Sequence, residues 1–533
     1  MKKVLTLFAV ALSVALSAQM NGVNQKAPEN WFNLSYSTDH VHGIGTDRTY
    51  ADLIQGKKPD TVIVAVIDGG VDYTHEDLKD VMWHNPGEIP DNGIDDDHNG
   101  YVDDVYGWNF IGGKDGKDVQ YDNLELTRLL RPLDKKFNGR DAASIQPAEK
   151  DEYNRYLKLK ADFDKRRADS QKTFDQISNF KRKMDGMKHE IKDQRKVDSV
   201  TYADYKAYTP SDQYKRLAMV LNLVCKNEDD WNNFNTEINE GYDELDAMLK
   251  YNLNLDYDPR SIVGDNYDDQ TEKYYGNNDV KGPDALHGTH VAGIIAANRG
   301  NNLGIKGVNS AVKIMAVRVV PNGDERDKDV ANGIRYAVDN GAKIINMSFG
   351  KGYSFNKKVV DDAVKYAESK GVLLVHAAGN DSKNNDNTDN FPNDHYLDGG
   401  TASNWIEVGA LSWKDGKEAV APFSNFGAAQ VNVFAPGVDI KSCKSNGGYI
   451  DESGTSMASP VTAGACALIK CYFPSLTPQQ IKTIIEQSSD KSLAKKRVIK
   501  PGYKKKKVKF KKLSTSGGVV DVYAAFRMAE TMK

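Results

Sequence analysis

The stretch KIMAVRVVPNGDERDKDVANGIRYAVDNGAKIINM, residues 313–347, contains the pattern that decides the fold. It opens with one apolar run, Lys313–Val319, and closes with another, Ala342–Met347. Continuous apolar runs of this length, rich in Val and Ile, are typical of strands buried on both faces of a parallel sheet. Between them, VANGIRYAVDNG has a helical pattern and ends at Gly341, a residue that easily adopts the left-handed turn that closes a helix. The stretch therefore predicts a strand, a helix and a second strand.

The same alternation extends in both directions along the chain. A second helical pattern, VVDDAVKYAESKG, ends at Gly371. Further short apolar runs are Val62-Ile67, Val372-Ala378, Trp405-Ala410 and Val431-Phe434. Strands and helices in steady alternation predict an α/β fold with a doubly wound, mostly parallel sheet.

The composition limits the classes of protein to consider. The chain has 533 residues, 39% hydrophobic and 27% charged, with a formal net charge of −4. A large core is therefore expected, and no overall field attracts nucleic acid. The first residues, MKKVLTLFAVALSVALSAQ, have the basic start, short apolar run and small-residue end of a secretory signal. We expect export to the periplasm, the outer surface or the medium, and no transmembrane segment.

Composition also divides the chain. Residues 147–250 are dense in Lys, Asp, Glu, Arg and Tyr, which predicts an amphipathic or coiled helix rather than a strand. The expected parts are a signal peptide at 1–18, an N-terminal arm at 19–60, a first part of the α/β domain at 61–114, a helical insertion at 115–280 and a second part at 281–533.

Three segments carry the residues of acyl-transfer chemistry. VIVAVIDGGVDYTHEDL places Asp68 at the end of a buried strand, HGTHVAGIIAA places His287 at the start of a helix, and SGTSMASPVTAGACALI places Ser456 at the head of another. A serine hydroxyl becomes a nucleophile when an imidazole takes its proton, and a buried carboxylate fixes the tautomer of that imidazole. Each residue alone has a simpler reading: a turn for Asp68, a cap for Ser456, and for His287 with His290 a metal pair. Together they predict a catalytic triad.

These segments resemble the Asp, His and Ser blocks of the subtilisin-like serine peptidases (subtilases), in the same order. VLLVHAAGND resembles the oxyanion block of that family, which implies that Asn380 donates to the tetrahedral intermediate. IINMSFG resembles the strand that pairs with substrate backbone. The resemblance thus implies a substrate-binding set and, from Phe349 and the small residues around Ala378, a pocket for a large apolar side chain. The implied substrate-binding residues are Ser348, Phe349, Gly350, Ala378 and Gly379.

The chain departs from the family pattern between the first two blocks, because 219 positions separate Asp68 from His287. The insertion either restricts which substrates reach the cleft, or is a surface addition that stabilises the domain.

The insertion begins near GIDDDHNGYVDDVYGWNF, where oxygen-bearing residues alternate around Gly100. Hard oxygen ligands around a glycine turn are typical of calcium sites, although the EF-hand's final Glu is replaced by Tyr106. An acidic turn without an ion is the alternative. The expected ligands of a structural calcium ion are Asp95, Asp97, Asn99, Tyr101, Asp103 and Asp104.

Lys495–Lys512 is strongly basic. It is expected to form a solvated hairpin or loop, or alternatively an anchor for anionic polymers or lipid headgroups.

The expected function is hydrolysis of protein or peptide substrates outside the cytoplasm through an acyl-enzyme, with no organic cofactor and no nucleic-acid partner. The alternatives are a narrow processing or quality-control peptidase that uses the insertion as its filter, and a peptide-binding protein without turnover.

Overall fold

The computed structural model describes residues 26–532, so the expected signal peptide at 1–18 lies outside the described residues. Two compact units are distinguished: unit 1 contains Leu126–Tyr257, and unit 2 contains Ala27–Glu125 and Asp258 onward. Each is described by itself.

Unit 2 is built on a parallel seven-stranded sheet with the order β2-β3-β1-β4-β5-β6-β7. The six expected apolar runs all form strands of this sheet. The strands are β1 (Val62–Asp68), β2 (Gly107–Asn109), β3 (Val312–Arg318), β4 (Ile344–Met347), β5 (Leu373–Ala377), β6 (Trp405–Leu411) and β7 (Val433–Pro436). The α/β prediction is confirmed.

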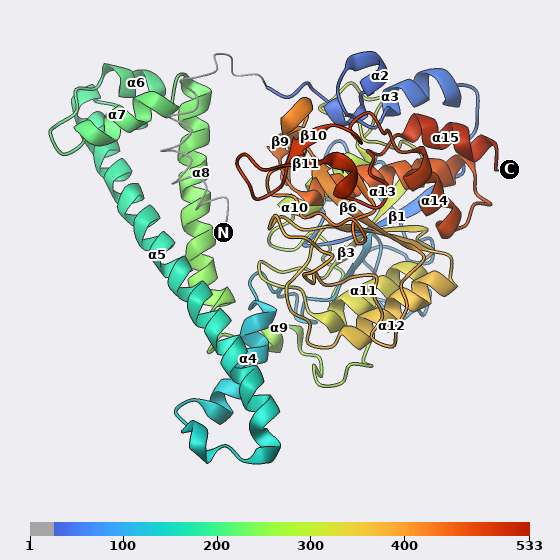
Figure 1. Cartoon of the computed structure of the whole chain (residues 1–533), viewed down its shortest axis with the longest axis horizontal. Coiled ribbons are helices and arrows are strands. Elements are labelled where there is room, and N and C mark those ends of the chain that lie inside the picture. Colours follow the sequence, from blue (N-terminus) through green and yellow to red (C-terminus); the bar gives the residue numbers. More distant parts are fainter. Residues whose placement is uncertain (1–25, 533) are drawn as a thin grey trace. The chain divides into compact units, whose positions relative to one another are not determined.

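Both faces of the sheet are covered, which explains why its strands are continuously apolar. Val64 and Val66 of β1 join one core with α10 (Leu286–Ala296) and α13 (Thr455–Tyr472). Ala65 and Ile67 point to the other core, with α11 (Asp327–Asp339) and α12 (Lys357–Ser369). Successive side chains of a strand point to opposite faces, so one strand supplies both cores. Figure 1 shows the two helix layers on either side of the sheet.

Smaller elements complete unit 2. They are α2 (Tyr36–Asp39), α3 (Thr46–Thr49), α9 (Arg260–Val263), α14 (Pro478–Ser488), α15 (Val522–Glu530), and the antiparallel pairs β8 (Ile440–Cys443) with β9 (Tyr449–Glu452) and β10 (Arg497–Ile499) with β11 (Lys507–Lys509). The segment expected as an N-terminal arm is partly buried in the core, where Trp31, Phe32 and Ile44 are at most 1% exposed. It is therefore an integral part of this unit.

Unit 1 is helical. Its elements are α4 (Glu125–Phe137), which starts at the last residue of unit 2, α5 (Lys150–Arg195), α6 (Tyr202–Ala207), α7 (Lys215–Val224) and α8 (Glu228–Ala247). One hydrophobic cluster of unit 1 surrounds Trp231 and Tyr205, whose stacked rings have centroids 4.9 Å apart.

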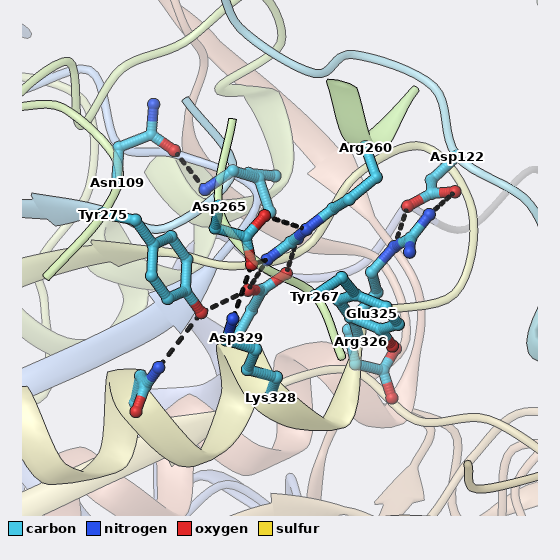
Figure 2. A network of polar contacts seen from close by, with 12 residues as sticks. Asn109, Asp122, Arg260, Asp265, Tyr267, Tyr275, Glu325, Arg326, Lys328 and Asp329 are labelled. Carbon is cyan, nitrogen blue, oxygen red and sulfur yellow. Dashed lines mark hydrogen bonds and ion pairs between the residues drawn. The ribbon is translucent and has the colours of Figure 1, made fainter. Parts of the chain in front are cut away.

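The chain of unit 2 is interrupted between Glu125 and Asp258. Buried ion pairs bind the segments on both sides of this interruption to the rest of the unit (Figure 2). Asp122, just before the interruption, binds Arg326 at 2.7 Å, and Arg260, just after it, binds Asp329 at 2.6 Å. Arg326 and Asp329 lie one turn apart, at the start of α11. Residues 115–125 and 258–280, expected in the insertion, thus belong to unit 2. Because removal of one partner leaves a buried charge unpaired, these pairs fix both segments firmly.

Candidate active site

Asp68 and His287 form a hydrogen-bonded pair beyond the carboxyl end of β1. His287 Nδ1 donates to the Asp68 carboxylate, 2.8 Å from Oδ1 and 3.0 Å from Oδ2. The backbone N–H of Gly69 also donates to Oδ1, at 2.7 Å. Asp68 is 2% exposed, whereas the His287 side chain is 45% exposed. The carboxylate is therefore buried behind an imidazole that solvent can reach.

Glycine lets helix α10 approach β1 closely enough for this pair. A Cβ on Gly288 would lie 2.1 Å from the carbonyl oxygen of Gly70, so no larger residue fits beside His287. The next histidine has a different role. His290 is fully buried, and its Nε2 donates to the carbonyls of Ile440 and Ile450. Burial lowers its pKa to about 3. The group of possible metal ligands found among residues 26–532 contains neither histidine.

The electrostatics of His287 follow from its carboxylate partner. Partial burial alone would lower the pKa of the imidazole, but the charge of Asp68 and its hydrogen bond raise it above the ordinary value. The imidazolium form is thus stabilised by Asp68, as a group that receives and returns a proton requires.

Ser456 lies in the first turn of α13, directly after Gly454 and Thr455. Its Oγ donates to the carbonyl of Ser348 at 3.0 Å, and Ser348 Oγ donates to the carbonyl of Ser456 at 2.9 Å. Among the described residues, Ser456 Oγ has no hydrogen bond to His287. Catalytic hydrogen bonds are often long or absent without substrate, so this arrangement does not exclude Ser456 as a nucleophile.

The side chain of Asn380 is fixed beside Ser456. Its Oδ1 accepts from the backbone N–H of Thr455 at 2.9 Å and from Thr455 Oγ1 at 3.0 Å, which leaves Nδ2 directed elsewhere. A Cβ built on Gly454 would lie 3.4 Å from Asn380 Nδ2 and 3.5 Å from the backbone nitrogen of Ser456. Two nitrogen donors therefore border the same small space.

The expected substrate-binding residues follow β4 and β5, on the same sheet edge as Asp68. Ser348 and Ala378 are buried, Phe349 and Gly379 are half-buried, and Gly350 is exposed. Carboxyl ends of neighbouring parallel strands meet at one edge, which is where α/β proteins bind ligands.

The acidic loop brings only part of its expected ligand set together. Carboxylate oxygens of Asp95, Asp97 and Glu88 lie within 4.8 Å of one another, and Glu88 was not among the expected ligands. Glu88 is 8% exposed, and its Oε2 has no hydrogen-bond partner. Burial, with repulsion from Asp97 and Asp96, raises the pKa of Glu88. Carboxylate oxygens grouped in this way are the kind of ligand that calcium prefers.

The remaining expected ligands have other partners. The Asp103 carboxylate accepts from the backbone of Asn92 and Gly93, and Asp104 binds Tyr336 and Asn85. Asn99 Oδ1 accepts from the backbone of Tyr101 at 2.8 Å. Asp103 and Asp104 lie outside the three-carboxylate group found among residues 26–532. The full set of six ligands stays a prediction.

Comparison with known proteins identifies the family of this chain. The model of the subtilase family matches residues 60–510, and the chain belongs to that family. It is 41% identical over 206 residues to a thermophilic serine proteinase of Bacillus sp. (strain AK1), which is 38% of this chain and 47% of that protein. It is 39% identical over 206 residues to thermitase of Thermoactinomyces vulgaris, 38% of this chain and 67% of that protein.

A third relative is the cell wall-associated protease of Bacillus subtilis (strain 168), 37% identical over 224 residues, 42% of this chain and 23% of that protein. The chain spans about half the length of the first relatives that it matches, 47% and 61%. Among the described residues, no helix is both long and apolar enough to cross a membrane.

Proposed function

We propose that the protein is a serine endopeptidase that cleaves protein substrates through an acyl-enzyme. The observation that carries the proposal is the pairing of an exposed imidazole, His287, with a buried carboxylate, Asp68, beside a serine at a helix start. Membership of the subtilase family and relatives named as serine proteinase and protease support it.

In this proposal Ser456 Oγ attacks the scissile carbonyl while His287 Nε2 takes its proton. Asp68 holds the Nδ1–H tautomer and stabilises the imidazolium. The developing oxyanion accepts hydrogen bonds from Asn380 Nδ2 and the backbone N–H of Ser456, which border one space. His287 then gives the proton to the leaving amine, which departs and leaves the acyl-enzyme. Water, deprotonated by His287, attacks the acyl-enzyme and releases the carboxylic acid product.

The test is hydrolysis of an internally quenched peptide library by wild type and Ser456→Ala. Cleavage by wild type only supports the proposal. Equal cleavage by both would overturn it, and binding of peptides without cleavage by either would favour the peptide-binding alternative.

We also propose that calcium binds the acidic loop through Glu88, Asp95 and Asp97. The support is the approach of three carboxylates together with the unpartnered Glu88 Oε2. Titration of the chelated protein with calcium is expected to show binding that Glu88→Gln weakens, with the exposed Asp91→Asn as the control. Absence of binding in wild type would end the proposal.

Export through the signal peptide at 1–18, to the periplasm, the outer surface or the medium, is likewise proposed. It is supported by the terminal sequence and by a relative named as cell wall-associated. Cleavage after Ala18, read by N-terminal sequencing of the mature protein, is the expected result.

The basic segment Lys495–Lys512 is proposed to contact anionic surfaces. It includes the hairpin β10–β11, and Lys504, Lys505, Lys506 and Lys507 are exposed with no carboxylate in ion-pair distance among the described residues. Each lysine near an anionic lipid surface contributes about 1 kcal/mol. Co-sedimentation with phosphatidylglycerol vesicles, but not phosphatidylcholine vesicles, is expected. It should be lost when these four are changed to Gln.

A further inference from the structure

A cavity of unit 2 lies at the end of the sheet where its parallel strands begin. Its volume is about 520 Å³, and sites for small molecules typically have about 300–1,000 Å³. Its lining includes residues just before three adjacent strands: Thr61 before β1, Lys343 before β4 and Lys370 before β5. Asp68 is the last residue of β1, so a strand of about 20 Å separates it from this cavity. The cavity is therefore distinct from the candidate active site.

Positive charge exceeds negative charge in the lining of this cavity. Its charged residues are Lys343, Lys370, Lys470 and Asp60. Lys343 and Lys370 are exposed. Among residues 26–532, none of the three lysines forms an ion pair with a carboxylate, Asp60 included. Three ammonium groups thus share one cavity without a protein anion to balance them.

Lys470, near the end of α13, is the lysine that the fold holds in place. It is half-buried, and its Nζ donates to the carbonyls of Pro474 and Leu476, at 2.8 and 2.7 Å. An ammonium group has three hydrogens, so one remains without an acceptor among the described residues. Burial and the charge of Lys343 lower the pKa of Lys470. Both effects disfavour the charged ammonium, and an anion in the cavity would offset them.

Hydroxyl and carboxylate groups line the same cavity. Thr61 and Ser475 are exposed, and neither side chain has a hydrogen bond to another described residue. The Asp60 carboxylate is also exposed and accepts no hydrogen bond from the described residues. A hydroxyl can donate or accept, and a carboxylate accepts only. These groups suit the hydroxyl groups of a ligand, whereas Asp60 would repel a second anionic group.

The start of helix α14 also borders the cavity, but it offers few free donors. Pro478 has no N–H, and Thr477 Oγ1 already accepts from the backbone N–H of Gln480, at 3.2 Å. The Gln480 side chain in turn accepts from the backbone N–H of Thr477, at 2.8 Å. The lysines, and not the helix start, are therefore the groups that would bind an anion.

We propose that this cavity binds a phosphate monoester of a sugar or a similar polyol. The three lysines bind the phosphate, because ammonium groups form short, charge-assisted hydrogen bonds with phosphate oxygens. Asp60, Thr61 and Ser475 bind the hydroxyl groups. The site does not rest on the proposed peptidase function, because Asp68, His287 and Ser456 take no part in it.

The test is isothermal titration of the full chain with glucose-6-phosphate, glucose and inorganic phosphate. Glucose-6-phosphate is expected to bind, inorganic phosphate to bind more weakly, and glucose not to bind measurably, because it lacks the charge that the lysines recognise. The cavity variant, Lys343→Gln with Lys370→Gln, should bind glucose-6-phosphate at least about tenfold more weakly, the scale for loss of a charge-assisted hydrogen bond.

The matched control is Lys79→Gln with Lys417→Gln, which removes the same charge from two exposed lysines of unit 2 outside the cavity. It should bind like wild type. Thermal denaturation shows whether each variant is folded, and glucose-6-phosphate should raise the Tm of wild type more than that of the cavity variant.

Three results would overturn the inference: no binding of glucose-6-phosphate to folded wild type, equal affinity of wild type and the folded cavity variant, or equal affinity for glucose-6-phosphate and inorganic phosphate. Failure of the proposed peptidase function would appear separately, as equal peptide cleavage by wild type and Ser456→Ala, and would leave the binding result intact.

Discussion

The two units of the chain differ in whether they contain buried ion pairs. Unit 2 buries ionic groups in pairs, such as Arg260 with Asp329 and Lys351 with Glu125. In unit 1 the ion pairs found among the described residues lie on exposed or partly exposed surfaces, and several join neighbouring turns of one helix, such as Lys160 with Asp164. Exposed pairs contribute at most about 1 kcal/mol, whereas loss of one partner of a buried pair costs about 3–5 kcal/mol.

The difference indicates which unit can hold catalytic side chains in fixed positions. The candidate catalytic groups of unit 2 lie at the ends of strands and the starts of helices whose other residues are buried, so their positions are fixed by the whole core. Unit 1 has a local core around Trp231 and long solvated helices. We infer that unit 2 carries the reaction.

The largest expected effect on peptide hydrolysis is that of Ser456→Ala, which removes the proposed nucleophile in unit 2. It should lower kcat by about a millionfold, the magnitude known for the relative subtilisin. The neighbouring Ser453→Ala is the control and should keep activity, because among the described residues its hydroxyl forms hydrogen bonds with Asp439 alone. Peptide hydrolysis at saturating substrate measures both, and a small effect of Ser456→Ala would contradict the triad.

Asn380→Ala should have the next largest effect. Loss of one oxyanion donor lowers kcat by about a hundred- to a thousandfold, again a magnitude known for subtilisin, with little change in KM. An increase in KM at constant kcat would instead assign Asn380 to ground-state binding.

The dependence on pH tests the pair of Asp68 and His287. His287 must be neutral to accept the serine proton, and Asp68 raises its pKa above 6.5. The value of kcat/KM should therefore rise with pH through an apparent pKa above 6.5 and level off beyond it. Because protonated His287 is stabilised only in the folded protein, its contribution to stability is fully present below the unfolded pKa and is lost as pH rises through the folded pKa.

In Asp68→Asn the neutral amide cannot hold the imidazolium. The apparent pKa should therefore fall, and the rate should fall steeply. A profile that is unchanged by this substitution would show that the acidic limb belongs to another group.

The smallest expected effect on peptide hydrolysis is that of Trp231→Ala in unit 1. Trp231 is 1% exposed, and truncation of such a side chain costs about 3–5 kcal/mol of stability. Short-peptide kcat/KM should nevertheless stay within about twofold of wild type. Trp405 in unit 2 is also 1% exposed, so Trp405→Ala removes a side chain of the same size and burial. This variant should lower kcat/KM strongly. Equal losses in the two variants would show that the reaction depends on both units.

The sheet could be predicted because its strands are apolar runs that end in polar residues. The sequence does not predict β2, because Gly107–Asn109 contains no apolar run. It forms a strand by pairing with β3, which lies far away in the sequence. The sequence points to Asp68, His287 and Ser456 because each stands in a long, specific motif at an element end, and their joint catalytic role stays a prediction.

Other features depend on contacts between distant loops. Glu88 has no motif of its own and joins Asp95 and Asp97 only after folding. Lys343, Lys370 and Lys470 line one cavity although they stand in three separate segments of the chain. The boundaries of the helical unit are narrower than expected because Asp122 and Arg260, in loop-like sequence, form buried ion pairs with α11.

The most direct test of the central claim is labelling of the purified protein with a fluorophosphonate, followed by peptide mapping. The account predicts one modified residue, Ser456, in wild type, at a rate that falls as His287 becomes protonated, and no modification in Ser456→Ala. Labelling at another serine, or equal labelling of wild type and Ser456→Ala, would contradict it.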